Sequence, residues 1–159
     1  MHHIPKGFGM SAFRGTSNHT LDTKGRLIIP ARFRSVIKAG REENVMVSKF
    51  DGALNVFTME EWDIFEKNLL EKRSPNMPKI RRFLIGSAQV CPLDKQGRIQ
   101  LPKELRAYAG IEPEGEVTLV GLVRRFEIWQ ASKLEDEQES INELMQTEEV
   151  REEIMDIGL

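Results

Sequence analysis

Apolar and polar positions follow one pattern twice along this chain, at an offset of 72 residues and without a gap. Leu21 has its counterpart in Leu93, and the apolar positions of a later, strand-rich stretch match one for one. The matched pairs are Val45 with Val117, Val47 with Leu119, Phe50 with Leu122, Leu54 with Phe126, Val56 with Ile128, and Phe57 with Trp129. The repeat is therefore a folding unit, spanning about residues 13–62 and 85–134.

Both copies predict the same order of elements: strand, turn, strand, short helix and hairpin. Short apolar runs at 27–29 and 99–101 predict strands, and the proline after each run suits the first residue of a helix. Helix-forming residues then predict helices over 31–38 and 103–109, each followed by a glycine that favours a stop.

The two hairpins differ in their turns. Asp51-Gly52 favours a tight turn between two strands. In the second copy Arg124-Arg125 takes that place, and neither residue readily adopts positive φ, so we expect a longer or different loop there.

Each copy is followed by a charged segment with helical spacing. Residues 59–72 predict an amphipathic helix, and Ser74-Pro75 with Met77-Pro78 then interrupt it. The tail repeats the spacing with Ile141, Leu144, Met145 and Ile154. The expected organisation is an N-terminal extension at 1–12, a first repeat with its helix at 13–73, a linker at 74–84, a second repeat at 85–134 and an acidic C-terminal helix at 135–159.

A copy of roughly 50 residues buries little apolar surface by itself, so we expect the two copies to share one core. The sequence thus predicts an α+β fold, mainly β, made of two pseudo-symmetric units with flanking helices.

One segment of the repeat carries most of the identity. Asp22-Thr-Lys-Gly25-Arg26-Leu-Ile-Ile-Pro-Ala-Arg-Phe-Arg34 aligns with Asp94-Lys-Gln-Gly97-Arg98-Ile-Gln-Leu-Pro-Lys-Glu-Leu-Arg106, and five of the thirteen positions are identical. Aspartate and glycine at this spacing predict a tight turn, because glycine accepts positive φ and aspartate bonds nearby amides.

The turn presents an arginine from the end of a rigid strand, which makes Arg26 and Arg98 the principal candidates for DNA binding. A guanidinium group can form a fork onto phosphate or onto guanine O6 and N7. Lys24 is the next candidate. Asp22 and Asp94 either brace the arginines or cap backbone amides of the turn. Glycines 25 and 97 support the turn.

Arg34 and Arg106 also occur at matched positions of the two copies. Each is either a further cationic contact, a member of an ion pair or a side chain that lies over the core. Aromatic residues at matched positions, such as Phe126 and Trp129, fit core packing better than a platform for stacking bases.

Charge is divided unevenly along the chain, which has a net charge of −2. Residues 1–134 carry 22 basic and 15 acidic side chains, whereas residues 135–159 carry ten acidic side chains and Arg151. The basic repeat region suits a nucleic acid. The acidic tail is either a solvated helix face or a segment that screens the basic surface.

No apolar run approaches the roughly 20 residues that cross a bilayer, and no membrane partner is expected. Residues 1–9 lack the features of a signal peptide and are expected to lie outside the fold, with Met10 a candidate natural start. The single cysteine, Cys91, excludes an internal disulfide and is better explained as a buried, inert thiol than as a nucleophile.

Enzymatic motifs are absent from the sequence. It has no glycine-rich phosphate loop and no Gly-x-Ser-x-Gly elbow, and His2, His3 and His19 do not form a ligand-spaced cluster. We therefore expect no enzyme, no cofactor and no metal site.

The two motifs, together with Phe13-Arg14-Gly15 near the start, resemble the MraZ family of the AbrB-like superfamily of swapped-hairpin DNA-binding proteins. The resemblance covers residues 13 to about 145. It implies two AbrB-like swapped-hairpin half-barrel units, and it adds Arg14 to the DNA-binding candidates.

The resemblance also implies a cytoplasmic, nucleoid-associated transcriptional regulator that binds short direct repeats upstream of the division and cell-wall gene cluster. Its partners would be double-stranded DNA and further copies of itself in a ring-shaped homo-oligomer, in which weak contacts add through effective concentration. The alternative is a structural or protein-interaction module of the same fold that does not bind DNA.

Overall fold

The two copies of the repeat form two sets of four strands in the computed structural model, which describes residues 12–159. The expectations about residues 1–9 and about a start at Met10 lie outside the described residues. The first copy contains β1 (Thr16–Thr20), β2 (Arg26–Ile28), β3 (Asn44–Phe50) and β4 (Ala53–Thr58), and the second contains β5 (Gln89–Pro92), β6 (Arg98–Gln100), β7 (Glu116–Gly121) and β8 (Arg125–Gln130).

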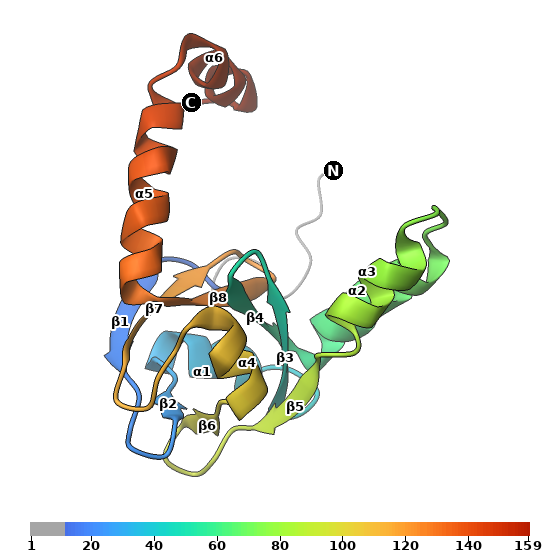
Figure 1. Cartoon of the computed structure of the whole chain (residues 1–159), viewed down its shortest axis with the longest axis vertical. Coiled ribbons are helices and arrows are strands. Elements are labelled where there is room, and N and C mark those ends of the chain that lie inside the picture. Colours follow the sequence, from blue (N-terminus) through green and yellow to red (C-terminus); the bar gives the residue numbers. More distant parts are fainter. Residues whose placement is uncertain (1–11) are drawn as a thin grey trace.

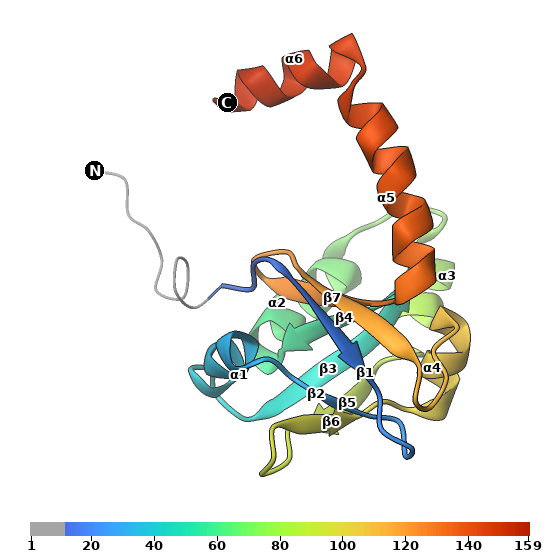
Figure 2. The same cartoon turned by 90° about the vertical axis from the view of Figure 1, so that its left-hand side faces the viewer.

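The copies exchange their first strands. The larger sheet has the order β1-β7-β8-β4-β3-β5, so β1 of the first copy pairs with β7 of the second, and β5 of the second pairs with β3 of the first. The smaller sheet pairs β2 with β6. Equivalent strands therefore meet at β4–β8 and at β2–β6, which defines an approximate twofold axis through the barrel (Figures 1 and 2).

One hydrophobic core fills the space between these sheets and draws residues from both copies. Leu27 and Ile99 occupy equivalent positions, face each other in the β2–β6 register and are 0% and 1% exposed. The rings of Phe13, Phe33 and Phe126 pack with centroids 4.9–5.2 Å apart. The predicted α+β fold of two swapped units with a shared core is confirmed.

The short helices are found where the sequence predicted them, as α1 (Ala31–Lys38) and α4 (Lys103–Ala109). The proline before each helix is its N-cap residue, one position before the first helical residue that the sequence predicts it to be. The strands before them begin and end one residue earlier than predicted, because the motif arginines already belong to β2 and β6.

The two hairpin turns differ as predicted, although at the offset of 72 residues Val123-Arg124, and not Arg124-Arg125, takes the place of Asp51-Gly52. Asp51 and Gly52 both have positive φ, +57° and +81°, and form a two-residue connection. In the second hairpin Val123 has a φ of +69°, and its N–H and carbonyl groups bond to Phe13 at 2.7 and 3.0 Å. The N-terminal segment thus stabilises the irregular loop of the second copy.

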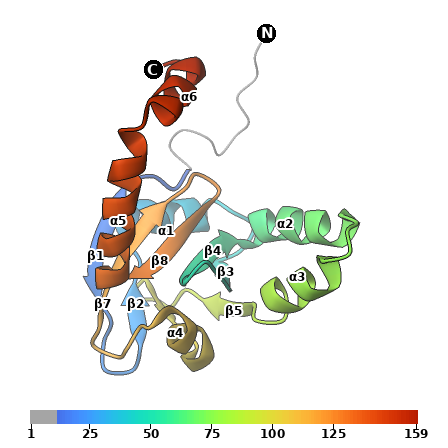
Figure 3. The same ribbon diagram turned by 45° about the horizontal axis from the view of Figure 1, so that its top comes forward.

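The first copy ends in a helical hairpin formed by α2 (Met59–Glu71) and α3 (Met77–Leu84). Figure 3 shows the two helices side by side. The segment expected to link the halves therefore contains a helix, since Pro78 lies in its first turn, where a missing N–H costs little. Arg81 ties the pair by donating to the carbonyl groups of Leu69 and Lys72, at 2.9 Å each.

The second copy ends in an arm of two helices, α5 (Ala131–Met145) and α6 (Glu148–Ile157). Neither helix contains a buried residue. The arm leaves the barrel on the side opposite the β1–β2 and β5–β6 loops, as both Figure 1 and Figure 2 show. The acidic tail is thus two helices, and it points away from the two motif turns.

Candidate nucleic-acid interface

The first Asp-x-x-Gly-Arg segment is a tight loop closed by one carboxylate. Asp22 Oδ1 accepts hydrogen bonds from the backbone N–H groups of Lys24 and Arg26, at 2.9 Å each. The N–H of Gly25 donates to the Asp22 carbonyl at 3.1 Å. Gly25 has a φ of +77°, a conformation that strains any residue with a side chain. The loop therefore requires aspartate and glycine at these positions.

The second segment repeats this loop. Asp94 Oδ1 accepts from the backbone N–H groups of Gln96 and Arg98, again at 2.9 Å each. Gly97 donates to the Asp94 carbonyl at 3.0 Å and has a φ of +80°. The identical residues of the motif thus give identical backbone geometry in both copies.

The other carboxylate oxygen of each aspartate holds the motif arginine. Arg26 Nε donates to Asp22 Oδ2 at 2.6 Å, and Arg98 Nε donates to Asp94 Oδ2 at 2.9 Å. The two roles that the sequence left open, capping the turn and bracing the arginine, are therefore performed by the same carboxylate. Each guanidinium is oriented before it meets a ligand, which lowers the entropy lost on binding.

These contacts also fix the charge of the turns. Hydrogen bonding by the Arg26 backbone N–H, supplemented by the Arg26 side chain, lowers the pKa of Asp22 below its usual value. The Arg98 backbone N–H and side chain lower the pKa of Asp94 in the same way. Both carboxylates are therefore ionised at neutral pH, and in each turn the aspartate and the arginine form a neutral ion pair whose guanidinium is partly exposed.

The two loops are joined to each other through their backbones. The N–H of Ile29 donates to the Gly97 carbonyl at 2.9 Å, and the N–H of Leu101 donates to the Gly25 carbonyl at 3.2 Å. Because these bonds obey the approximate twofold symmetry, the loops form one rigid unit at the end of the β2–β6 ribbon.

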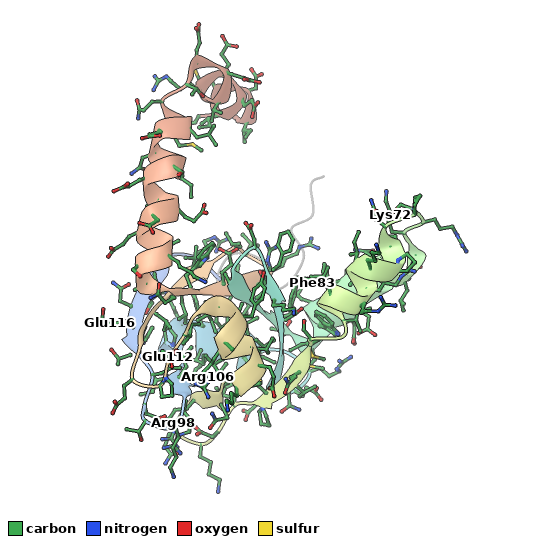
Figure 4. The ribbon with its side chains drawn as sticks, viewed as in Figure 1. Lys72, Phe83, Arg98, Arg106, Glu112 and Glu116 are labelled. Carbon is green, nitrogen blue, oxygen red and sulfur yellow. The ribbon has the colours of Figure 1, made fainter. Side chains whose placement is uncertain are left out.

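Side chains extend this connection. Gln100 Nε2 donates to the Lys24 carbonyl at 2.7 Å, and Arg98 Nη1 lies 3.9 Å from Asp22 Oδ2. The structure therefore brings Arg26 and Arg98 to one face, at the end of the molecule distant from α6; Figure 4 labels Arg98 there. Sequence reasoning does not predict the Gln100 contact, which joins residues 76 positions apart.

Arg34 and Arg106 support the turns from behind. Arg34 donates to the Ile29 carbonyl, and Arg106 Nε donates to the Leu101 carbonyl at 3.1 Å. Each also covers the turn of the other copy: a Cβ on the second turn glycine would lie 2.6 Å from Arg34 Cδ, and one on the first would lie 2.9 Å from Arg106 Nε. These arginines therefore position the loops.

The remaining candidates separate in space. Lys24 is exposed on the first loop, beside Arg26. Arg14 lies at the other end of β1, a five-residue strand, so about 17 Å of strand separates it from the first turn. Within the described structure, Arg14 is thus remote from the face that the two turns form.

His19 and Cys91 occupy equivalent positions in the exchanged strands; His19 is half-buried, whereas Cys91 is buried. Burial, followed by the charge of Arg32, lowers the pKa of His19. Burial raises the pKa of the Cys91 thiol to about 11, which favours the inert reading of this cysteine. Among residues 12–159, no three histidine, cysteine or acidic side chains gather as metal ligands. Nor is any helix in that range long and apolar enough to span a membrane.

Comparison with known proteins identifies relatives of nearly the same length. A family model described as "MraZ protein, putative antitoxin-like" matches residues 12–82 and 84–155. The two matched segments correspond to the two copies of the repeat, including the helices that follow each.

Individual relatives agree with this match. A protein of Desulforapulum autotrophicum is 46% identical over 147 residues, which is 92% of this chain and 99% of that protein. Relatives from Desulfosudis oleivorans and Pediococcus pentosaceus are 42% and 38% identical, with the same shares of each chain covered. All three carry the name "Transcriptional regulator MraZ".

Proposed function

The chain belongs to the MraZ family, and from that premise we propose that it is a transcriptional regulator that binds double-stranded DNA through its two joined turns. The observation that carries this proposal is the pair of braced arginines, Arg26 and Arg98, on one rigid face. Guanidinium groups fixed in this way suit hydrogen bonding to phosphates and to the guanine edge in the major groove. Lys24 adds a nearby positive charge that suits phosphate.

The finer proposal is that the sites are short direct repeats upstream of the division and cell-wall gene cluster, and that the protein acts in the cytoplasm at the nucleoid. This rests on family membership and on the repetition of the turn, since a protein with repeated contacts gains affinity from repeated sites.

We also propose that copies of the chain assemble into a ring. Large apolar side chains are exposed on both helical arms, among them Leu70 at 61%, Leu144 at 51% and Met155 at 67%. Residues 72–84 carry five basic and no acidic side chains, which complements the acidic segment 135–159 of a second copy. Such a head-to-tail contact generates a closed ring or a filament. A native mass equal to one chain at micromolar concentration and low salt would refute it.

The alternative, a protein-interaction module without DNA binding, is favoured by the negative net charge and the exposed acidic arm. Binding measurements separate the two. We would titrate the protein with the duplex upstream of its own coding sequence and with a scrambled duplex, at two salt concentrations.

The double variant Arg26→Ala/Arg98→Ala tests the assignment. It should lose the preference for the native duplex, with about 1 to 3 kcal/mol lost per base contact. The matched control is Lys38→Ala/Lys67→Ala, which also removes two exposed positive charges but lies on α1 and α2, outside both turns and outside residues 72–84. Equal behaviour of the two double variants would contradict the proposal, and an absence of preference in the wild-type protein would favour the interaction module.

A further inference from the structure

The two turns are related by an approximate twofold axis, yet their side chains are not equivalent. A protein with true twofold symmetry reads a palindrome, because each half contacts the same bases on opposite strands. Here the exposed pair Thr23-Lys24 of the first turn corresponds to Lys95-Gln96 of the second. The lysine thus moves by one position between the copies, while the charge of the turn stays the same.

This exchange changes how the motif arginines are held. Gln96 Oε1 accepts a hydrogen bond from Arg98 Nη2 at 3.1 Å. Arg98 is therefore held at three points, by Asp94 at Nε, by Gln96 at Nη2 and, more weakly at 3.9 Å, by Asp22 at Nη1. A lysine in place of Gln96 has no oxygen to accept such a bond.

Arg26 is held at one point. Within the described residues its guanidinium bonds to Asp22 through Nε, and both of its Nη groups lack a hydrogen-bond partner. Lys24, the counterpart of Gln96, can only donate. The two Nη groups of Arg26 therefore remain available as a fork for a base edge or a phosphate.

The backbones of the turns also differ, but here the first turn is the more tightly held of the two. Gln100 ties the carbonyl of Lys24 to the second copy at 2.7 Å. The counterpart of Gln100 is Ile28, which is 55% exposed and has no polar group with which to hold the second turn. The first turn thus combines a fixed backbone with an available arginine fork, and the second combines a less restrained backbone with an arginine already engaged.

From these differences we infer that each protomer reads DNA with a fixed polarity: Arg26 makes the bidentate contact to a guanine edge, and Arg98 contacts the phosphate backbone. Positions 23–24 and 95–96 determine that polarity. The inference rests on the proposed DNA binding and specifies how the site is read. Its consequence is that the element recognised by one protomer is not a palindrome, so that protomers facing the same way select repeats in the same orientation.

The test is a selection from a library of random duplexes by the full-length protein, followed by titration of the selected element. Wild-type protein should enrich a non-palindromic element. The variant Lys95→Thr/Gln96→Lys gives the second turn the side chains of the first without changing net charge. It should enrich a palindromic element, and its preference for the wild-type element over a symmetrised duplex should fall roughly tenfold, the value of one bidentate contact.

A charge-neutral exchange outside the turns and outside residues 72–84, Lys67→Asn/Asn68→Lys on α2, is the matched control and should leave the wild-type element unchanged. A melting temperature equal to that of the wild-type protein would establish that each variant is folded. A palindromic element enriched by the wild-type protein, or an unchanged element enriched by Lys95→Thr/Gln96→Lys, would overturn the inference while leaving DNA binding in place. Failure of the wild-type protein to enrich any element would overturn the proposed function itself.

Discussion

The two halves of this molecule share their interior and differ at their ends. In the first half α3 folds back on α2, and the pair buries Trp62, Leu69 and Met77. In the second half α5 and α6 form an open arm that buries no residue (Figure 3). The same motif thus builds the same core, while the residues after it decide whether the following helices close.

The offset of 72 residues explains the difference residue by residue. Met77, which is buried, corresponds to Glu149, which a core would reject. Arg81, which donates to the carbonyl groups at the end of α2, corresponds to Glu153, which has no donor and repels the negative end of a helix. The arm is therefore open because its sequence lacks the two residues that close the hairpin.

The largest expected effects come from the shared interior, where the halves should behave alike. Leu27→Ala and Ile99→Ala each remove a side chain that is at most 1% exposed, so each should cost about 2 to 5 kcal/mol of unfolding free energy. Trp62 and Trp129 lie in different halves of the molecule. Variants that keep only one of the two tryptophans should therefore give denaturation curves that coincide with each other.

The matched control for this prediction is Ile28→Ala, at a position that is 55% exposed in the same strand, and it should cost less than about 0.5 kcal/mol. Separate transitions for the two tryptophans would mean that the halves do not share a cooperative core.

The next effect distinguishes the two ends. Arg81→Ala removes the donor that serves the last carbonyl groups of α2 and should destabilise the protein by about 1 to 2 kcal/mol. Glu153→Ala, at the equivalent position of the open arm, should change stability by less than about 0.5 kcal/mol. Chemical denaturation of the two variants gives both values, and equal losses would show that Arg81 does not close the hairpin.

A smaller difference is expected between the two turn aspartates. Their pKa values lie below the unfolded value of about 3.9, so the ionised carboxylates favour the folded state. That contribution is fully present above the unfolded pKa and is lost as the pH falls through the lowered folded pKa. Asp22→Asn and Asp94→Asn should therefore flatten the fall in melting temperature below about pH 4.

Asp22 lies near both motif arginines, whereas Asp94 holds Arg98. Asp22→Asn should accordingly reduce the fall in melting temperature at acid pH more than Asp94→Asn does. Melting curves between pH 7 and pH 2.5 test the order of the two variants. If the melting temperature of both variants falls with pH as steeply as that of the wild-type protein, the role assigned to the carboxylates would be contradicted.

Local pattern was enough to predict much of this structure. The helices at 31–38 and 103–109, the Asp51-Gly52 turn and the need for glycine at positions 25 and 97 follow from short-range rules, because each depends on residues that are close in sequence. The shared core followed from the size of the repeat. The exchange of first strands is predicted only by the resemblance to the family, since nothing in the residues of β1 indicates that β7 is its partner.

What the residue pattern missed depends on contacts between distant parts of the chain. The sequence predicts a linker where helix α3 lies, because Pro78 is typical of a break, although a proline in a first turn also begins a helix. The contact of Gln100 with Lys24 and the placement of Arg34 and Arg106 over the opposite turns require the two copies to be brought together. No rule based on neighbouring residues predicts them.

The smallest effect is expected from removing the open arm. Helix α6 has no buried residue, so deletion of residues 147–159 should change the unfolding free energy of the protomer by less than about 0.5 kcal/mol. Deletion of residues 135–159 tests whether the acidic tail screens the basic surface. The arm leaves the barrel on the side opposite the turns. Screening by solvent ions limits the range over which exposed charges interact to about 8 Å at physiological salt. Affinity for a duplex that carries a single site, where the assembly of several copies adds nothing, should therefore stay the same at matched salt. Tighter binding by the shortened chain would show that the arm reaches the turns, most directly those of a neighbouring copy, and that the open end competes with DNA in a way that the closed hairpin does not.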